Sequence, residues 1–435
     1  MTPFLRPATA HPCPALGGAI RPVGDKSLTH RALILAALAR GQSRIAHPNP
    51  GEDCRATARS LEQIGARLRP TATGWEITGA AGGLHDPDEI LHMGNSGTGL
   101  RLMAGVIAGQ SLYGVLTGDA SLRERPMRRI AEPLERMGAT VLLRRGEFPP
   151  IAVRGGGMRP IEYGLPVASA QVKGCILIAA LGLKEGRVIL KEPGPSRDHT
   201  ERMLAWLGVP ISRGEDTVAL SAPLQPHHGF SWIIPADLSA ACFYIVAATL
   251  VPGSDIRLDG VLLNPTRSGC LDILREMGAD LTIDETGSEG PEPVGSIRAR
   301  SSALRGVTIS GSLLLRAADE VPILAVAAVA ATGETVIRDA AELRVKESDR
   351  IEAAADLVRS LGGEADVGAD SIRIRGRGFL TGGTVACRGD HRLAMSALVA
   401  GCAARGPVSV DDVGPVATSD PTFLDRLTQL GGQLT

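Results

Sequence analysis

Cationic and hydrogen-bonding side chains gather at several points where helices are expected to begin. Residues 24–31 read Gly-Asp-Lys-Ser-Leu-Thr-His-Arg, and residues 344–350 read Arg-Val-Lys-Glu-Ser-Asp-Arg. A helix N-terminus presents unpaired N–H groups and about half a positive charge, so cations placed there favour an anion. Lys346 and Arg350 are four residues apart, so they would share one helical face if the helix has begun there, and would repel each other unless an anion lay between them. The pattern indicates a site for acidic small molecules.

Each of these segments also has a simpler interpretation. Lys26 could be a side chain that extends to solvent from a capped helix, and the basic run at residues 123–129 could be a solvated face. The turn at residues 94–99 would let backbone approach a ligand, but it matches neither the dinucleotide nor the P-loop fingerprint. No single segment therefore identifies the ligand.

Six short, alanine-rich apolar runs each follow an Asp or Ser. These residues are Asp25, Ser96, Ser169, Asp237, Asp319 and Asp390. Such side chains accept hydrogen bonds from first-turn N–H groups, and Pro322 suits the first turn of the helix after Asp319. We therefore predict six capped helices that are apolar all round and buried on every side.

A second pattern, which ends in glycine, also occurs six times, at steps of roughly 70 residues. Its glycines are Gly65, Gly138, Gly208, Gly278, Gly362 and Gly431. We read it as an amphipathic outer helix that stops at a left-handed glycine and is followed by a strand. Six units of this size account for nearly all 435 residues.

The two patterns together predict six βαβαββ-type repeats and an α/β class. Six repeats divide naturally into two domains of three, each with parallel buried helices surrounded by sheets and outer helices, an inside-out α/β barrel. We expect an N-terminal domain at residues 23–236 and a C-terminal domain at 1–22 plus 237–435. Three helix N-termini from each domain would then face a shared interdomain cleft.

Composition excludes several other classes of protein. A net charge of −1 and an aromatic content of 3% argue against a nucleic-acid binder. Seven scattered cysteines without a Cys-x-x-Cys pair indicate a reducing compartment and no zinc site. The proline-containing start does not resemble a signal peptide, and apolar runs are too short to span a membrane. We expect a cytoplasmic protein that binds neither nucleic acid nor membrane and acts as a monomer.

Taken in order at the repeat boundaries, the segments resemble the 5-enolpyruvylshikimate-3-phosphate synthase family of enolpyruvyl transferases. The resemblance covers essentially the whole chain. It rests on residues 25–31, 94–98, 125–126, 169–171, 344–350 and 390–392. It implies transfer of the enolpyruvyl group of phosphoenolpyruvate to the 5-hydroxyl of 3-phosphoshikimate, with release of phosphate and without a metal or organic cofactor.

The resemblance also implies a role for each matching residue. The residues implied to hold 3-phosphoshikimate are Lys26, Ser27, Arg31, Ser169, Ala170, Gln171, Arg197, Asp319 and Lys346. Those implied to hold phosphoenolpyruvate are Lys26, Gly97, Arg125, Gln171, Arg350 and Arg392. Asp319 would accept the 5-hydroxyl proton and Glu347 would protonate the methylene carbon, with Lys26 as an alternative proton-transfer group.

Two departures from the family pattern, and the identity of residue 97, affect these expectations. Ala170 replaces a serine of some members, and residues 417–419 (Ala-Thr-Ser) replace a lysine that others carry near the C-terminus. Gly97, which is often alanine in members insensitive to glyphosate, implies sensitivity to that inhibitor.

A related enzyme class that uses UDP-N-acetylglucosamine typically has a loop cysteine, whereas residues 114–129 contain none and offer Arg125. A non-catalytic repeat scaffold would explain the periodicity but not the charges at the helix starts.

Overall fold

The computed structural model describes residues 5–80, 83–222 and 226–435, which divide into two compact units. The N-terminal unit consists of Gly24–Ile234 with Glu289–Glu292, and the C-terminal unit contains the remainder, including the segment that ends at Val23. Among the described helices, none combines the length and the apolar character needed to cross a bilayer.

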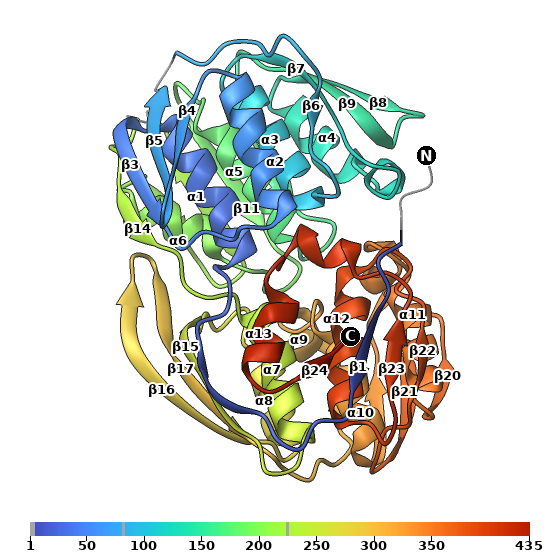
Figure 1. The fold of residues 1–435 in the computed structure, drawn as a ribbon. Coiled ribbons are helices and arrows are strands. Elements are labelled where there is room, and N and C mark those ends of the chain that lie inside the picture. Colours follow the sequence, from blue (N-terminus) through green and yellow to red (C-terminus); the bar gives the residue numbers. More distant parts are fainter. Residues whose placement is uncertain (1–4, 81–82, 223–225) are drawn as a thin grey trace. The chain divides into compact units, whose positions relative to one another are not determined.

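Each unit contains three four-stranded sheets (Figure 1). In the N-terminal unit the strand orders are β14(Ser231–Ile233)-β3(Arg40–Ala46)-β5(Gly74–Ala80)-β4(Arg67–Thr71), β6(Leu91–His92)-β7(Tyr113–Thr117)-β9(Phe148–Arg154)-β8(Thr140–Arg144) and β10(Glu162–Gly164)-β11(Arg187–Lys191)-β13(Thr217–Ser221)-β12(Ile211–Arg213). In the C-terminal unit they are β16(Asp280–Glu289)-β17(Glu292–Arg300)-β15(Asp255–Leu262)-β2(Gly17–Ile20), β18(Thr308–Ile309)-β19(Thr332–Ile337)-β21(Ile372–Arg377)-β20(Glu364–Val367) and β22(Gly383–Val385)-β23(Val408–Val410)-β1(Ala8–His11)-β24(Gln433–Leu434).

Three strands are paired outside their own sequence repeat. Strand β2 lies parallel to β15, and β1 pairs with both β23 and β24, so the start of the chain completes two sheets of the C-terminal unit. Strand β14 lies parallel to β3 and completes the first sheet of the N-terminal unit. The chain therefore passes from one unit to the other between β2 and the next helix, and again after β14.

Six inner helices form the cores of the two units. They are α1(Lys26–Leu38), α3(Gly97–Gly109) and α5(Ala170–Ala180) in the N-terminal unit, and α7(Leu238–Leu250), α10(Val321–Ala330) and α12(His391–Ala403) in the C-terminal unit. Nearly every residue of these helices is buried, which confirms the prediction made from their apolar composition. Figure 1 shows α1, α3 and α5 side by side inside their unit.

Glycines let α3 and α5 approach closely. A Cβ atom at Gly105 would lie 2.4 Å from the carbonyl oxygen of Cys175, and one at Gly109 would lie 2.6 Å from that of Ala179. Larger residues at these positions would force the helices apart, because packed interiors have no spare volume. The small-residue composition of the inner helices is therefore a packing requirement.

Outer helices cover the sheets and end as the repeats predict. They are α2(Glu52–Gln63), α4(Arg128–Arg136), α6(His199–Trp206), α8(Gly269–Glu276), α11(Arg350–Ser360) and α13(Phe423–Gln429). All six repeat glycines that follow them have a positive φ, from 78° at Gly208 to 111° at Gly431. A left-handed residue at this position satisfies the last carbonyl groups of the helix, and glycine adopts it without steric cost.

Four short helical segments complete the fold: α9(Gly311–Leu315) and the 3₁₀ helices η1(Leu122–Glu124), η2(Ala341–Val345) and η3(Gly414–Thr418). Both η1 and η2 lie just before residues that the sequence singles out, Arg125 and Lys346.

Candidate active site

In the N-terminal unit, the first turns of the three inner helices contact one another. The ring of His30 on α1 lies 3.4 Å from the hydroxyl oxygen of Ser96, the N-cap of α3. The side-chain amide of Gln171 on α5 donates to the hydroxyl of Thr98 on α3, at 2.8 Å. Three helix N-termini therefore meet at one end of this unit, which concentrates unpaired N–H groups and partial positive charge.

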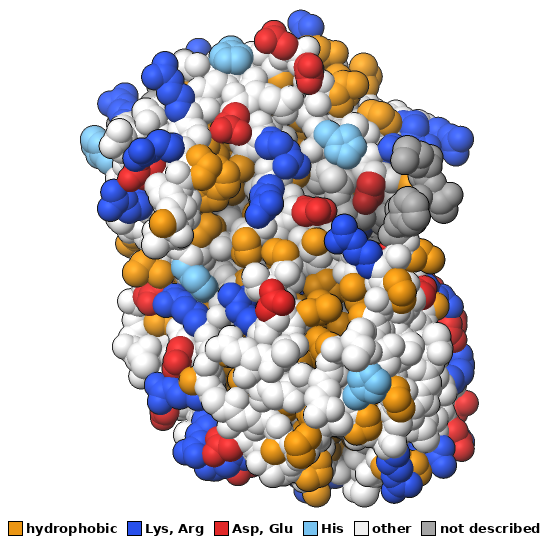
Figure 2. Space-filling model, viewed as in Figure 1, with side chains coloured by type: hydrophobic (Ala, Val, Ile, Leu, Met, Phe, Trp, Pro, Cys, Tyr) orange, Lys and Arg blue, Asp and Glu red, His pale blue; other side chains and the backbone are white. Residues whose placement is uncertain are grey.

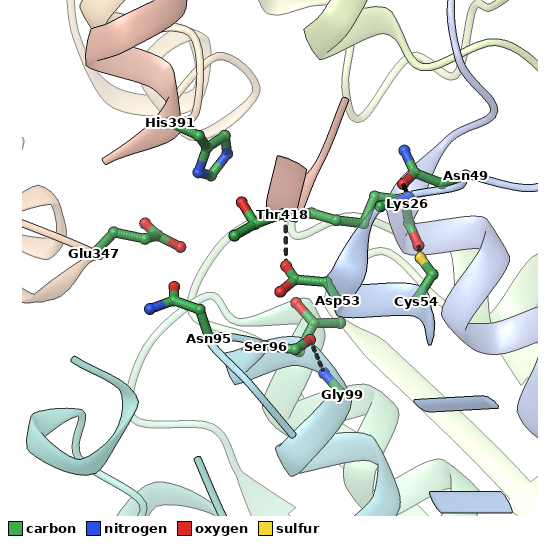
Figure 3. Close-up of polar contacts among 12 residues, drawn as sticks. Lys26, Asn49, Asp53, Cys54, Asn95, Ser96, Gly99, Glu347, His391 and Thr418 are labelled. Carbon is green, nitrogen blue, oxygen red and sulfur yellow. Dashed lines mark hydrogen bonds and ion pairs between the residues drawn. The ribbon is translucent and has the colours of Figure 1, made fainter. Parts of the chain in front are cut away.

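Side chains cap all three of these helices, as predicted. Asp25 accepts from the N–H of Leu28 at 2.8 Å, and Ser96 accepts from that of Gly99 at 2.9 Å. Ser169 accepts from that of Val172 at 3.4 Å. Figure 3 shows the Ser96–Gly99 contact. The caps fix the position at which each helix begins, and therefore the positions of Lys26, Gly97 and Ala170 in the first turns.

Lys26 forms an ion pair with Asp53 in the first turn of α2. The Nζ–Oδ2 distance is 2.9 Å, and only 17% of the lysine side chain is exposed (Figure 3). The simpler interpretation, an exposed lysine reaching to solvent, is wrong. The ammonium group is held at the shared end of the inner helices and can bind an anion or transfer a proton there.

Arg31 is buried, and none of its hydrogen bonds within the described residues goes to a carboxylate. Its guanidinium donates to the hydroxyl of Thr200 at 2.7 Å and to the carbonyl oxygens of Ser27 at 2.9 Å and Ala170 at 3.4 Å. Burial is the main cause that lowers the pKa of Arg31 to about 10; nearby Arg197 acts in the same direction, while Glu201 and Asp25 oppose the change. An anion bound next to Arg31 would compensate its charge, which is the property expected of a phosphate ligand.

Arg125 and Arg101 place two guanidinium groups beside Gly97. A Cβ atom at Gly97 would lie 3.1 Å from an Nη1 atom of each arginine. Arg125 is 7% exposed and donates to the side-chain oxygen of Asn95 at 2.6 Å, while Arg123 and Arg128 of the same basic run are exposed. The run is therefore not a uniform solvated face. Arg125 alone of these three turns inward.

The remaining predicted residues of this unit lie around the same helix starts. Ala170 supplies its backbone carbonyl to Arg31, and Gln171 also accepts from the Arg101 guanidinium. Arg197 is half-buried, just before α6, and close enough to Arg31 to influence its pKa. The structure brings Lys26, Ser27, Arg31, Gly97, Arg125, Ser169, Ala170, Gln171 and Arg197 to one end of the unit.

In the C-terminal unit the starts of α7, α10 and α12 also meet. The hydroxyl of Ser239 on α7 donates to the carboxylate of Glu320, the residue before α10. Arg392 on α12 lies 3.9 Å from the same carboxylate. Asp237 and Asp390 cap α7 and α12 by accepting from the N–H groups of Ser239 and Arg392, at 2.8 and 2.9 Å.

Three charged groups, those of Lys346, Glu347 and Asp390, contact Asp319 or Arg350. The Asp319 carboxylate oxygen Oδ1 lies 3.3 Å from Arg350 Nη1 and 3.6 Å from Lys346 Nζ. Arg350 also pairs with Glu347 at 2.7 Å and with Asp390 at 2.9 Å. Two carboxylates suited to proton transfer, Asp319 and Glu347, therefore share one cation.

The carboxylates determine the charge state of Arg350. Burial opposes a charge on Arg350, but Asp390, Glu347 and Asp319 together raise its pKa above the usual value. Burial likewise opposes ionisation of Asp390, yet the Arg350 guanidinium keeps the pKa of Asp390 below its usual value. The pair is mutually stabilised in the charged form.

One sequence prediction for this unit is wrong, and the condition attached to a second is not met. The N-cap position of α10 belongs to Glu320, which makes no side-chain cap bond, and the Asp319 carboxylate pairs with Lys346 and Arg350. Lys346 and Arg350 do not share a helical face, because α11 begins only at Arg350 and Lys346 is extended after η2. The anion between these two cations is the carboxylate of Asp319.

The segment that departs from the family near the C-terminus lies in and just after η3. Thr418 donates its hydroxyl to the carbonyl of Pro415 at 2.8 Å, and residues 417–419 are half-buried.

Several residues of these clusters escape sequence reasoning. Arg101 lies inside an apolar helix, and Asp53, Thr200 and Glu320 belong to ordinary helix starts. Arg101 alone could have been found from the sequence, because it is a charged residue within an otherwise apolar run. No group of three or more metal-binding side chains occurs in the parts of the chain that the structure describes. On the face shown in Figure 2, charged side chains of both signs are interspersed.

Comparison with known proteins assigns the family. The family described as EPSP synthase (3-phosphoshikimate 1-carboxyvinyltransferase) matches residues 11–427. The 3-phosphoshikimate 1-carboxyvinyltransferase of Desulforudis audaxviator is 47% identical over 94% of this chain and 95% of its own length. That of Gluconobacter oxydans is 45% identical over 99% of both chains.

Solved structures agree with the sequence matches. The structure of EPSP synthase from Acinetobacter baumannii has a TM-score of 0.87 and 38% identity, and 99% of each chain is covered. The enolpyruvyl transferase NikO from Streptomyces tendae shares the fold, with a TM-score of 0.80 at 18% identity. This chain belongs to the EPSP synthase (3-phosphoshikimate 1-carboxyvinyltransferase) family.

Proposed function

We propose that the protein transfers the enolpyruvyl group of phosphoenolpyruvate to the 5-hydroxyl of 3-phosphoshikimate and releases phosphate. As a 3-phosphoshikimate 1-carboxyvinyltransferase (EC 2.5.1.19), it acts in the shikimate route to chorismate and the aromatic amino acids. The observation that carries the residue assignment is the contact of Asp319 with both Lys346 and Arg350, beside Glu347.

In the addition step, ionised Asp319 accepts the proton of the 5-hydroxyl while that oxygen attacks C2 of phosphoenolpyruvate. Glu347 gives a proton to the methylene carbon C3, so a tetrahedral phosphate ketal forms. In the elimination step the Glu347 carboxylate, which gave up its proton in the addition, takes a proton from the new methyl group. The C2–O bond to phosphate breaks, its electron pair leaves on inorganic phosphate, and the double bond is regenerated. Lys26, held by Asp53, is the alternative group for either proton transfer.

Two groups of residues are proposed to bind the two anionic substrates. Ser27, Arg31, Ser169, Gln171 and Arg197 hold the acceptor, with the backbone of Ala170 in place of a serine, and Lys346 and Asp319 complete its contacts. Lys26, Gly97, Arg125, Gln171, Arg350 and Arg392 hold phosphoenolpyruvate. Guanidinium groups suit this role because they bind carboxylate and phosphate with two parallel hydrogen bonds.

Because each substrate takes residues from both units, the proposal requires that the units close over the substrates. The domains proposed for this are residues 23–236 and 1–22 plus 237–435, and the protein is proposed to act as a monomer. Small-angle scattering should show compaction when 3-phosphoshikimate is added. An unchanged radius of gyration would contradict the closure.

The function itself is tested by phosphate release from the purified protein with both substrates. We expect release that depends on 3-phosphoshikimate, with UDP-N-acetylglucosamine inactive as the acceptor. Release with UDP-N-acetylglucosamine instead would assign the protein to the other acceptor class.

A further inference from the structure

The residue before α10, Glu320, is a buried carboxylate that the proposed chemistry does not use. It is 1% exposed, and it stands at the N-cap position without making a cap bond. Its oxygen Oε1 accepts from the Ser239 hydroxyl, whereas Oε2 has no hydrogen-bond partner among the described residues. Burying a carboxylate oxygen without a hydrogen-bond partner is unfavourable, so its presence here calls for an explanation.

Glu320 belongs to a chain of contacts that links the starts of three inner helices. Arg267, which is 2% exposed, donates from Nη2 to the Ser239 hydroxyl at 2.6 Å and to the Asp237 carboxylate at 3.0 Å. Ser239 in turn donates to Glu320. Because Ser239 on α7 donates to it, the Glu320 carboxylate is held in one orientation.

The other end of the chain of contacts is Arg392. Its Nη1 atom lies 3.9 Å from Glu320 Oε1, and Arg392 is 7% exposed. Its backbone N–H is already fixed by Asp390, so the helix start is held and only the long side chain has freedom. A buried negative charge at this distance limits the directions in which the guanidinium can point.

We propose that Glu320 is a positioning residue that holds the Arg392 guanidinium ready for the anionic groups of the enolpyruvyl donor. This inference rests on the proposed function, in which Arg392 binds phosphoenolpyruvate. Ser239 and Arg267 orient Glu320 and do not touch substrate. The pairing predicts an effect confined to donor binding, because Glu320 neither gives nor takes a proton.

The test is steady-state kinetics of Glu320→Gln with each substrate varied separately. We expect the KM for phosphoenolpyruvate to rise about 10-fold, from loss of a charge-assisted contact, with the KM for 3-phosphoshikimate and kcat changed less than about threefold. In an Arg392→Lys background, Glu320→Gln should add less than about twofold, because the two residues act as a pair. Equal changes in both KM values, or independent effects of the two substitutions, would overturn the proposal.

Two further variants keep the test decisive. Ser239→Ala leaves the carboxylate in place but removes the bond that orients it, and should raise the same KM about threefold; it decides the matter if Glu320→Gln does not fold. Asp420→Asn is the matched control, because Asp420 is also 1% exposed but contacts Thr422 and Tyr244 instead. An inactive wild-type protein would refute the proposed function, whereas an active wild type with an unaltered Glu320→Gln would refute only this inference.

Discussion

A buried arginine lies at the inner-helix starts of each unit, and the two arginines have opposite kinds of hydrogen-bond and ion-pair partners. Arg31 in the N-terminal unit donates to a hydroxyl and two carbonyl groups, and its pKa is lowered to about 10, chiefly by burial. Arg350 in the C-terminal unit contacts three carboxylates, and they raise its pKa in spite of burial. The first arrangement leaves positive charge for a ligand, and the second couples a cation to groups that can transfer protons.

This difference would let similar repeats carry different parts of the proposed reaction. A guanidinium without a carboxylate partner gains most when an anion arrives, so the N-terminal cluster suits phosphate binding. Carboxylates held by cations are oriented, and an ionised one such as Asp319 can act as a base, so the C-terminal cluster suits proton transfer. Each repeat places a cationic side chain near a helix start, and the groups that contact this side chain determine whether it suits ligand binding or proton transfer.

The largest expected effect is loss of turnover when the carboxylates of the C-terminal cluster are neutralised. Asp319→Asn and Glu347→Gln should each lower kcat by about 10²- to 10⁴-fold, because each removes a proton-transfer group. The measurement is phosphate release at saturating substrates. The control is Asp356→Asn, which removes an exposed carboxylate of α11 that pairs with Arg359. Full activity in both variants would remove the proposed acid and base.

A stability comparison separates the two arginines directly. Arg350→Met would leave Asp390 buried and unpaired, so the free energy of unfolding should fall by about 3–5 kcal/mol. Arg31→Met loses hydrogen bonds to neutral groups and relieves a buried charge, so the loss should be about 1 kcal/mol. Urea unfolding of both variants measures the difference. Similar losses of unfolding free energy in the two variants would contradict the proposed difference between the environments of Arg31 and Arg350.

The variant Gly97→Ala tests whether the space between Gly97 and the guanidinium groups of Arg101 and Arg125 is needed for ligand binding. The added methyl group would stand 3.1 Å from both Arg101 and Arg125, so one guanidinium must shift. We expect glyphosate to inhibit the wild type, and inhibition to weaken by about 10- to 100-fold in the variant, with a smaller rise in the KM for phosphoenolpyruvate. A wild type that resists glyphosate would show that Gly97 does not govern sensitivity.

The smallest effect concerns His30, buried between the starts of α1 and α3. Burial, with Lys26 and Arg31 nearby, lowers its pKa to about 3, so below pH 6.5 the unfolded chain binds a proton that the folded chain does not. Stability should therefore be complete above pH 6.5 and fall toward pH 3, by about 1.4 kcal/mol per pH unit for this residue. Unfolding of His30→Gln between pH 6.5 and 5 should show a shallower slope than His85→Gln, which removes an exposed histidine. Equal slopes would contradict this.

Much of the fold could be predicted because it depends on local rules repeated six times. The left-handed glycines and the burial of the inner helices follow from turn chemistry and composition, and all are confirmed. Capping was right at five of the six helices. It failed at α10, where Asp319 pairs with cations from a segment that is distant in sequence.

The partners within the site could not be predicted from sequence. The contacts of Arg31 with Thr200, of Arg101 with Gln171 and of Glu320 with Ser239 all join different helices. Such contacts depend on how the helix starts meet, which no periodicity specifies. Sequence therefore indicated where charge gathers, but not which charges are compensated.

The most direct test of the contrast between the clusters is titration of 3-phosphoshikimate into three forms of the protein by calorimetry, without phosphoenolpyruvate. Relative to the wild type, Arg31→Met should weaken binding by about 10-fold or more, because a charged contact with phosphate is lost. Glu347→Gln should bind within about threefold of the wild type, since it removes only a proton donor. Unchanged binding by Arg31→Met, or a large loss in Glu347→Gln, would contradict the division of labour between the two units.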